Sequence, residues 1–148
     1  RGEAADADAA ARQYEKDLAM VFRVPSGGPP PCFDVVLLGI GTDCHTASLF
    51  PGTPALAEKA RWVVANPGPQ GGVRRLTFTP PVLCAADLVL VLVSGADKVD
   101  ALPAVLQGPL DVSQRPAQLL RQARGTVVWL VDEVAAVKLD RATLDRTR

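Results

Sequence analysis

Three short apolar runs constrain the fold of this chain more than any other feature. They are Phe33–Ile40, Leu88–Val93 and Thr126–Val131, and each is rich in Val and Leu and bounded by glycine, proline or charged residues. A nearly continuous apolar run of this length is typical of a strand buried on both faces, as in a parallel sheet. We therefore expect all three runs to be central strands of one sheet that is mainly parallel.

Segments with helical character separate these strands. Alanine content, apolar spacing and capping residues predict helices at Glu3–Phe22, Thr53–Ala60, Pro81–Ala86, Asp97–Gln107, Ala117–Gln122 and, for a short helix, from Asp132 onward. Pro103 lies inside one of them and predicts a kink or a displaced boundary. Arg61–Ala65 and Arg75–Thr79 read as short strands, and residues 23–32 as a Pro/Gly loop. Strands that alternate with helices predict a single open α/β domain with helices on both faces of the sheet.

Composition excludes several partners. The chain has 148 residues with 16 basic and 16 acidic side chains, so no global field attracts it to nucleic acid or to an anionic membrane. No apolar run approaches the roughly 20 residues that a membrane span needs. Cys32, Cys44 and Cys84 lie far apart without metal-ligand spacing. We expect reduced thiols, a cytoplasmic protein and no metal.

Polar sequence follows two of the predicted strands. Ile40 runs into Gly41–His45, and Val93 runs into Ser94–Lys98. Ligands of open α/β sheets bind beyond the carboxyl ends of the strands. If the two strands are neighbours, both segments lie on one rim of the sheet and form a candidate site.

The first of these segments contains the groups for acid–base chemistry. Gly39 and Gly41 permit a sharp turn and a close approach of backbone to a ligand. Asp43 and His45 lie two residues apart, so in an extended loop both side chains face the same way. A carboxylate beside an imidazole fixes its tautomer, and an imidazole titrates near neutrality, where it can take a proton from water. His45 is the only histidine, and a packing or capping role remains open for it.

The stretch Gly39–Gly52 reads G-I-G-T-D-C-H-T-A-S-L-F-P-G. It resembles the signature of the 6-phosphogluconolactonases, G-[ML]-G-x-D-G-H-T-A-S-L-F-P-G. Further family patterns follow in the same order, at Arg74–Leu83, Val93–Lys98, Pro116–Ala117 and Val128–Ala135. The related glucosamine-6-phosphate deaminases share the core up to the histidine but continue with I-A-F-N-E. Thr46–Phe50 therefore favours the lactonase family.

The resemblance implies a Rossmann-like α/β sheet and the hydrolysis of 6-phospho-D-glucono-1,5-lactone to 6-phosphogluconate in the pentose phosphate pathway, without a cofactor. His45 would be the general base and Asp43 would orient it. Lys98 would meet the phosphate or the developing negative charge, and Gly41 and Thr46 would contact the substrate. The expected partner is a small phosphosugar lactone.

Two departures from the family pattern are expected to matter. Cys44 stands where family members carry glycine, and a positive φ there would cost on the order of 1 kcal/mol. Family members are also longer, and the Gly-rich phosphate loop and the arginine of their first half have no counterpart in this sequence. We therefore expect the C-terminal portion of a larger lactonase domain, whose partner is the missing N-terminal half.

Three alternatives remain open from the sequence. The chain could be a non-catalytic half-domain that binds a partner or a phosphosugar, or it could have deaminase-like activity. Cys44 could be a nucleophile instead of a packing residue. Individual residues also have structural interpretations: Asp43 as a turn residue, Thr46 and Ser48 as helix caps, and Lys98 as a solvated lysine.

Overall fold

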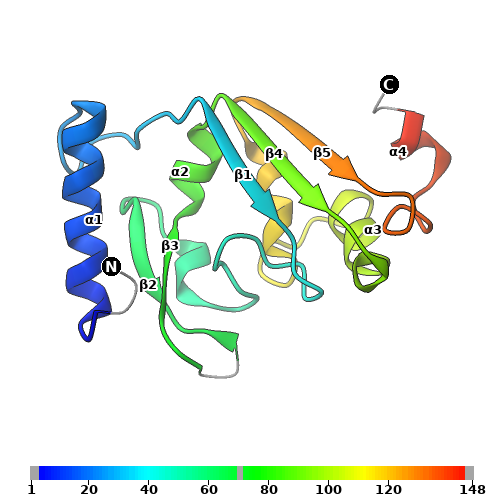
Figure 1. Ribbon diagram of the computed structural model, residues 1–148, viewed down its shortest axis with the longest axis horizontal. Coiled ribbons are helices and arrows are strands. Elements are labelled where there is room, and N and C mark those ends of the chain that lie inside the picture. The colour runs from blue at the N-terminus through cyan, green and yellow to red at the C-terminus, as the bar shows by residue number, and fades with distance from the viewer. Residues whose placement is uncertain (1–3, 70–71, 146–148) are drawn as a thin grey trace.

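The predicted parallel sheet is present, as the computed structural model in Figure 1 shows for residues 4–69 and 72–145. It contains β1 (Val35–Gly39), β4 (Leu88–Val93) and β5 (Thr126–Val131) in the order β1-β4-β5, and both pairs of strands are parallel. All three apolar runs are strands of this sheet, which confirms the prediction. Because β1 and β4 are neighbours, the polar segments that follow them share one rim.

A small antiparallel hairpin stands beside this sheet. It pairs β2 (Val63–Asn66) with β3 (Arg75–Phe78), and α1 (Ala7–Phe22) packs along it. The helix begins later than predicted, because the Asp6 carboxylate accepts the Ala9 N–H at 2.9 Å and caps it. The sequence predicted these three elements but not that β2 and β3 form a separate sheet.

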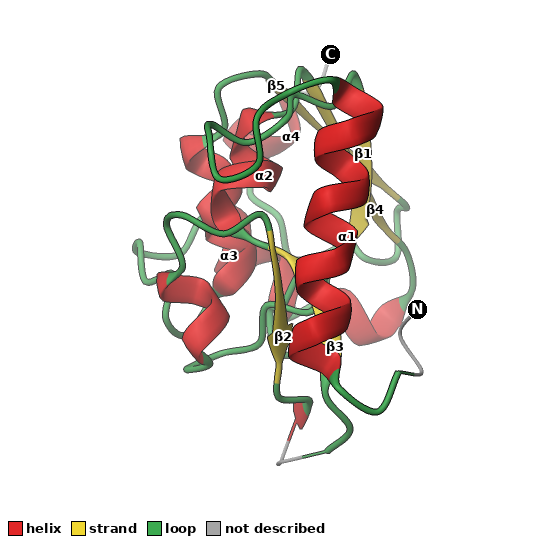
Figure 2. Ribbon diagram, turned by 90° about the vertical axis from the view of Figure 1, so that its left-hand side faces the viewer, coloured by secondary structure: helices red, strands yellow, loops and turns green. Residues whose placement is uncertain are grey.

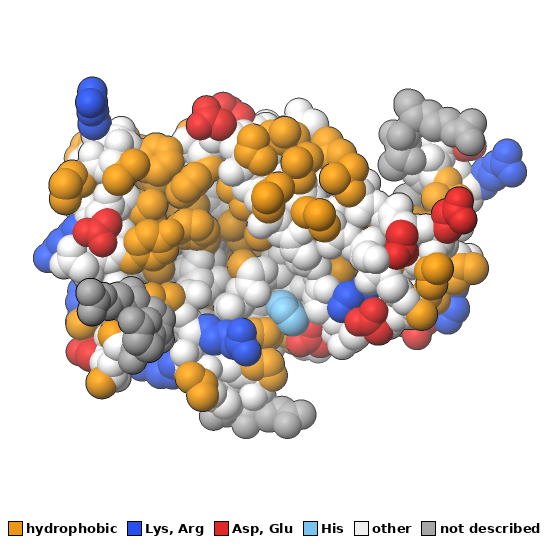
Figure 3. Space-filling model, viewed as in Figure 1, with side chains coloured by type: hydrophobic (Ala, Val, Ile, Leu, Met, Phe, Trp, Pro, Cys, Tyr) orange, Lys and Arg blue, Asp and Glu red, His pale blue; other side chains and the backbone are white. Residues whose placement is uncertain are grey.

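Helices cover one face of the parallel sheet in the described part of the chain. They are α2 (Pro80–Ala85), α3 (Ala101–Leu106) and the 3₁₀ helix η4 (Pro116–Gln122), which Figures 1 and 2 show on the same side. Val89 and Val91 of β4 point into this core and are fully buried. The other face is open, and its exposed aliphatic side chains form the orange patch over the strands in Figure 3: Val35, Leu37, Leu92 and Leu130. The second layer of helices expected from the sequence is not among the described residues.

Several helices are shorter than predicted. The segment predicted as a helix from Thr53 to Ala60 is a four-residue 3₁₀ helix, η1 (Pro54–Ala57), because the Glu58 carboxylate takes the backbone N–H groups that a longer helix would use. The predicted helix Asp97–Gln107 is divided into a 3₁₀ helix, η3 (Ala96–Lys98), and α3. The expected boundary shift near Pro103 is thus present, with the proline in the first turn of α3, where its missing N–H costs little.

The predicted helix from Asp132 is wrong. Residues 133–138 form turns, and the last helix, α4 (Arg141–Asp145), starts later. The Asp132 carboxylate instead joins the ends of two strands, as described below. Among the described residues, no helix is long and apolar enough to cross a membrane.

Candidate active site

The loop after β1 is folded tightly by its own backbone. The Gly41 N–H donates to the His45 carbonyl at 2.9 Å, and the Cys44 N–H donates to the Gly41 carbonyl at 3.0 Å. This turn requires a positive φ at Cys44, which is 65°, as the glycine of the family signature suggested. The strain of about 1 kcal/mol is offset by packing, since Cys44 is 7 % exposed and lies within the main core cluster.

The Cys44 side chain is poorly suited to be a nucleophile. Burial raises the pKa of its thiol, and a thiol is nucleophilic only as the thiolate. Its sulfur lies 3.8 Å from the carbonyl oxygen of Ala101, inside the core. These observations favour the packing role over the nucleophile alternative.

Asp43 and His45 form the polar centre of the loop. Asp43 Oδ1 lies 2.5 Å from His45 Nδ1 and also accepts the His45 backbone N–H at 3.1 Å. Partial burial favours the neutral acid, but these hydrogen bonds outweigh it and keep the pKa of Asp43 below its ordinary value. A charged Asp43 holds the ring with Nδ1 occupied and Nε2 available. Both side chains remain accessible, at 32 % for His45 and 43 % for Asp43.

Gly41 provides the space for this pair. A Cβ at Gly41 would collide with the His45 ring and would lie 2.6 Å from Asp43 Oδ1. A Cβ at Gly39 would meet only the Leu92 carbonyl oxygen, at an ordinary 3.5 Å. Neither residue has a positive φ. Gly41 is therefore required because the side chains of Asp43 and His45 leave no space for a Cβ there. The backbone conformation of the turn does not itself require glycine at position 39 or 41.

Thr46 and Ser48 anchor the loop on both sides. The Thr46 hydroxyl is fully buried and donates to the Gly39 carbonyl at 2.9 Å, which ties the loop to the end of β1. The Ser48 N–H donates to Thr77 Oγ1, and its carbonyl accepts from the Asn66 side chain, which ties the loop to the β2–β3 hairpin. No helix begins here, so the capping role considered for these residues is wrong.

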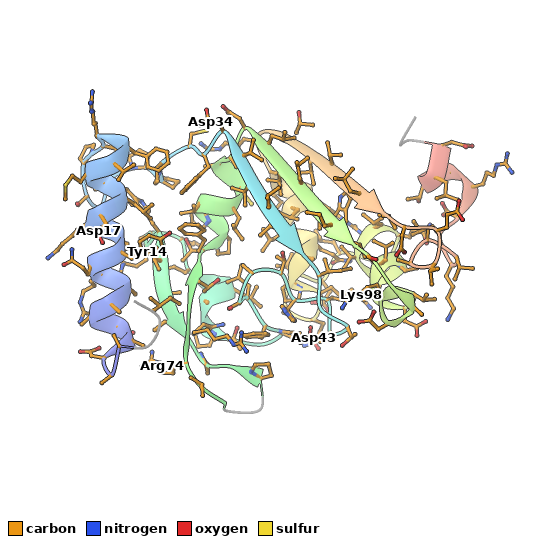
Figure 4. All side chains as sticks on the ribbon, in the orientation of Figure 1. Tyr14, Asp17, Asp34, Asp43, Arg74 and Lys98 are labelled. Atoms are coloured by element: carbon orange, nitrogen blue, oxygen red, sulfur yellow. The ribbon has the colours of Figure 1, made fainter. Side chains whose placement is uncertain are left out.

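Lys98 lies on the same rim as Asp43, on the segment that follows β4, and Figure 4 shows both below the carboxyl ends of β1 and β4. Its Nζ is 2.8 Å from the carboxylate of Asp97. The Asp132 side chain holds this segment, because it accepts from Ser94 Oγ at 2.6 Å and from the Gly95 N–H at 2.9 Å. Asp132 was not identified from the sequence, although its position directly after β5 was an available signal.

Phe50 and Arg75 extend the site on its other side. The Phe50 ring is 5 % exposed, and its centroid lies 4.7 Å from that of the His45 ring at an angle of 56°. The guanidinium carbon of Arg75 stands 6.0 Å from the Phe50 centroid. The neighbouring Arg74 points to α1, where it pairs with Asp8. The sequence did not distinguish the two arginines, and placed neither at the site.

In the described residues, no group of three or more His, Cys, Asp or Glu side chains is arranged to hold a metal ion. The arrangement does provide an oriented imidazole, an ionised carboxylate and two cations around an accessible rim. Such a set can activate water beside an anionic ligand.

Comparison with known proteins shows which family this chain resembles. The model of the glucosamine-6-phosphate isomerases/6-phosphogluconolactonase family matches residues 1–129. The 6-phosphogluconolactonase of Synechocystis is 43 % identical over 136 residues, which cover 92 % of this chain and 55 % of that protein.

Solved structures agree with this match. The 6-phosphogluconolactonase of Trypanosoma brucei superposes with a TM-score of 0.79 at 35 % identity, over 95 % of this chain and 56 % of that one. A monomeric glucosamine-6-phosphate deaminase superposes with a TM-score of 0.67 at 25 % identity, over 91 % of this chain and 56 % of that one. The chain thus spans about half the length of the relatives it matches.

Proposed function

The chain belongs to the glucosamine-6-phosphate isomerase/6-phosphogluconolactonase family, and we propose that it contributes the general base to the hydrolysis of 6-phospho-D-glucono-1,5-lactone to 6-phosphogluconate, a step of the pentose phosphate pathway. The observation that carries the proposal is the contact between Asp43 and His45 at the rim of the parallel sheet. It places an oriented base where open α/β sheets bind ligands.

The proposed reaction uses one water molecule and no covalent intermediate. His45 Nε2 takes a proton from water while the water oxygen attacks C1 of the lactone, which leaves a negative charge on the carbonyl oxygen. When this intermediate collapses, the bond from C1 to the ring oxygen breaks, and the imidazolium returns the proton to that oxygen. Asp43 stabilises the charged imidazolium, as a carboxylate does in other base–carboxylate pairs.

Lys98 supplies a positive charge for the substrate phosphate or for the negative charge that develops on the carbonyl oxygen. Gly41 keeps the space in which the base is held, and its backbone lies beside the bound ligand. Thr46 was expected at the substrate. Its buried hydroxyl supports a positioning role, in which it fixes the loop that carries His45.

The lactone is a better candidate substrate than glucosamine 6-phosphate. Thr46–Phe50 follows the lactonase signature, and the lactonases named above are more similar to this chain than the deaminase is. The second candidate function is the deamination of glucosamine 6-phosphate, in which an amino sugar is opened and isomerised. Consumption of glucosamine 6-phosphate is the direct test of that activity.

We further propose that a complementing segment covers the open face of the sheet. β1 is an edge strand with one partner in the described structure, and a groove of about 440 Å³ runs beside it, lined by Tyr14, Phe33, Leu37, Ala47, Leu76 and Phe78. Strands of parallel sheets are normally buried on both faces. The relatives are about twice as long as the matched region, so the N-terminal part of the same domain fits this role.

The test compares this chain with a complemented enzyme, in which the chain is mixed with, or fused to, the remaining part of the Synechocystis lactonase. The complemented enzyme should hydrolyse the lactone well above the spontaneous rate, and the chain alone should be slow. Glucosamine 6-phosphate should not be consumed. A complemented enzyme that folds but leaves the lactone at its spontaneous rate would overturn the proposal.

A cytoplasmic location is part of the same proposal. Cys32, Cys44 and Cys84 are free thiols, which suits a reducing compartment. Fractionation of the source cells, followed by detection of the protein in each fraction, tests this location.

A further inference from the structure

We propose that Asn66 is a positioning residue for His45. Asn66 fixes the part of the loop that carries Phe50, and the Phe50 ring in turn sets the orientation of the imidazole. This inference rests on the proposed function and adds to it a residue of β2, outside the stretch Gly39–Gly52. Asn66 acts at a distance, through Thr53 and the backbone of the loop.

Asn66 is an uncommon residue for its place in the fold. It ends β2 and is 1 % exposed, whereas asparagine is depleted in strands and a buried amide is costly unless it is hydrogen-bonded. Its Nδ2 donates to the Ser48 carbonyl at 2.8 Å and to Thr53 Oγ1 at 2.9 Å, while its Oδ1 has no partner among the described residues. A carbonyl can only accept, so the amide nitrogen must face Ser48. Both N–H groups of the side chain are therefore committed to the loop.

Thr53 transmits this restraint to Phe50. Its hydroxyl accepts from Asn66 and donates to the Phe50 carbonyl at 2.7 Å, and its backbone N–H donates to the same carbonyl at 3.2 Å. Ser48 is held from both strands of the hairpin, which Figure 1 shows beside the segment that follows β1, because its N–H donates to Thr77 Oγ1 at 3.1 Å and its carbonyl accepts from Asn66. The backbone is thus fixed on both sides of Phe50.

Phe50 provides the second restraint on the imidazole. The hydrogen bond with Asp43 fixes Nδ1 of His45, but one contact leaves the ring free to turn about that atom. The Phe50 ring closes one side of the imidazole, with its centroid 4.7 Å away at an angle of 56°. This ring is 5 % exposed, so it cannot move far unless the loop moves. A general base must keep its nitrogen within hydrogen-bond reach of the attacking water, and both contacts are needed to hold it there.

The single histidine makes the orientation measurable. Its ring C–H signal in an NMR spectrum has no overlap from other histidines and shifts when a neighbouring aromatic ring moves. Thr53→Val keeps the shape of the side chain but breaks the connection from Asn66 to Phe50. It should shift the His45 signal and lower kcat of the complemented enzyme by about 10- to 100-fold, since a misplacement of about 1 Å can cost 100-fold. KM should change little, because no contact with the substrate is lost.

Three further variants complete the test. Asn66→Leu removes both donors and should have the same two effects as Thr53→Val. Thr53→Ser keeps the hydroxyl and should restore the signal and kcat. Thr79→Val is the matched control, because it makes the same change at a fully buried threonine whose hydroxyl donates to the Arg61 carbonyl, at the opposite end of the hairpin from Asn66. It should lower the urea midpoint without moving the His45 signal or kcat.

The outcomes separate this inference from the proposed function. Circular dichroism establishes which variants are folded, and the Thr53 pair decides alone if Asn66→Leu is not. An unmoved His45 signal in folded Thr53→Val or Asn66→Leu overturns the positioning role, and so does an equal shift in Thr79→Val. A shifted signal with undiminished kcat, in an enzyme whose activity depends on His45, also overturns it. If the complemented enzyme hydrolyses no lactone, the proposed function fails, and the NMR comparison still decides whether Asn66 sets the orientation of His45.

Discussion

A single methyl group at Gly41 should disable the site without unfolding the protein. In Gly41→Ala the new Cβ would lie 2.6 Å from Asp43 Oδ1 and would overlap the His45 ring. Ordinary contacts of a Cβ begin near 3.4 Å. The imidazole and the carboxylate must therefore move by a distance on the order of 1 Å, which is enough to cost about 100-fold in rate when a catalytic group is misplaced.

The loss should appear in kcat and not in stability. A 100-fold decrease corresponds to about 2.7 kcal/mol of transition-state stabilisation. The His45 side chain is 32 % exposed, so it can swing toward solvent without opening the core. The φ of Gly41 is not positive, so alanine fits its backbone. We expect the free energy of unfolding to change by less than about 1 kcal/mol.

The assay is lactone hydrolysis by the complemented enzyme, with urea unfolding of each variant. Gly39→Ala is the matched control, because it lies two residues away and its Cβ meets only the Leu92 carbonyl oxygen at 3.5 Å. It should retain nearly full kcat. If Gly41→Ala keeps the kcat of Gly39→Ala, the crowding beneath His45 does not control catalysis and the reasoning is refuted.

Three further predictions concern other residues. Cys44→Ala should destabilise the protein more than Cys44→Gly in urea unfolding, because alanine keeps the strain of a φ of 65° while glycine relieves it; the reverse order would argue against strain. Lys98→Ala should lower kcat/KM for 6-phosphogluconolactone, because it removes a positive charge that meets the substrate phosphate or the negative charge of the transition state; an unchanged kcat/KM would contradict this. Glu15 is partly buried, which favours its neutral form, but hydrogen bonds from Arg61, Val63 and Trp62 outweigh burial and lower its pKa. Its contribution to stability is thus present above the ordinary carboxyl pKa and is lost as the pH falls through the lowered pKa of the folded state. The difference in melting temperature between the unsubstituted chain and Glu15→Gln should therefore shrink in acid, and a constant difference would refute it.

The central strands and the base were predictable because local sequence determines them. Polar residues occur only near the ends of the three apolar runs, so a buried strand is the environment that fits them. Asp43 and His45, the residues proposed for catalysis, both lie within the short stretch Gly39–Gly52. The pairing of β1 with β4 then brings Lys98 to the same rim.

The remaining features depend on contacts between distant segments. Glu58 ends a helix by accepting backbone N–H groups, and Asp132 joins the segments after β4 and β5 instead of starting a helix. The difference between Arg74 and Arg75 depends on Asp8, which lies 66 residues away. The spacing of residues along the chain does not indicate which distant residues will be in contact. These features could therefore be identified only from the structure.

The role of His45 is tested most directly by the rate of 6-phosphogluconolactone hydrolysis by the complemented enzyme with and without His45→Ala. If His45 is the general base, the substitution should lower kcat by about 10²- to 10⁴-fold, the usual contribution of such a group. Circular dichroism and the urea midpoint should stay unchanged, since the side chain is accessible and its ring contacts Asp43 and Phe50 at the surface of the loop. A folded His45→Ala enzyme with undiminished kcat would contradict the assignment of the base, and with it the catalytic role of the Asp43–His45 pair.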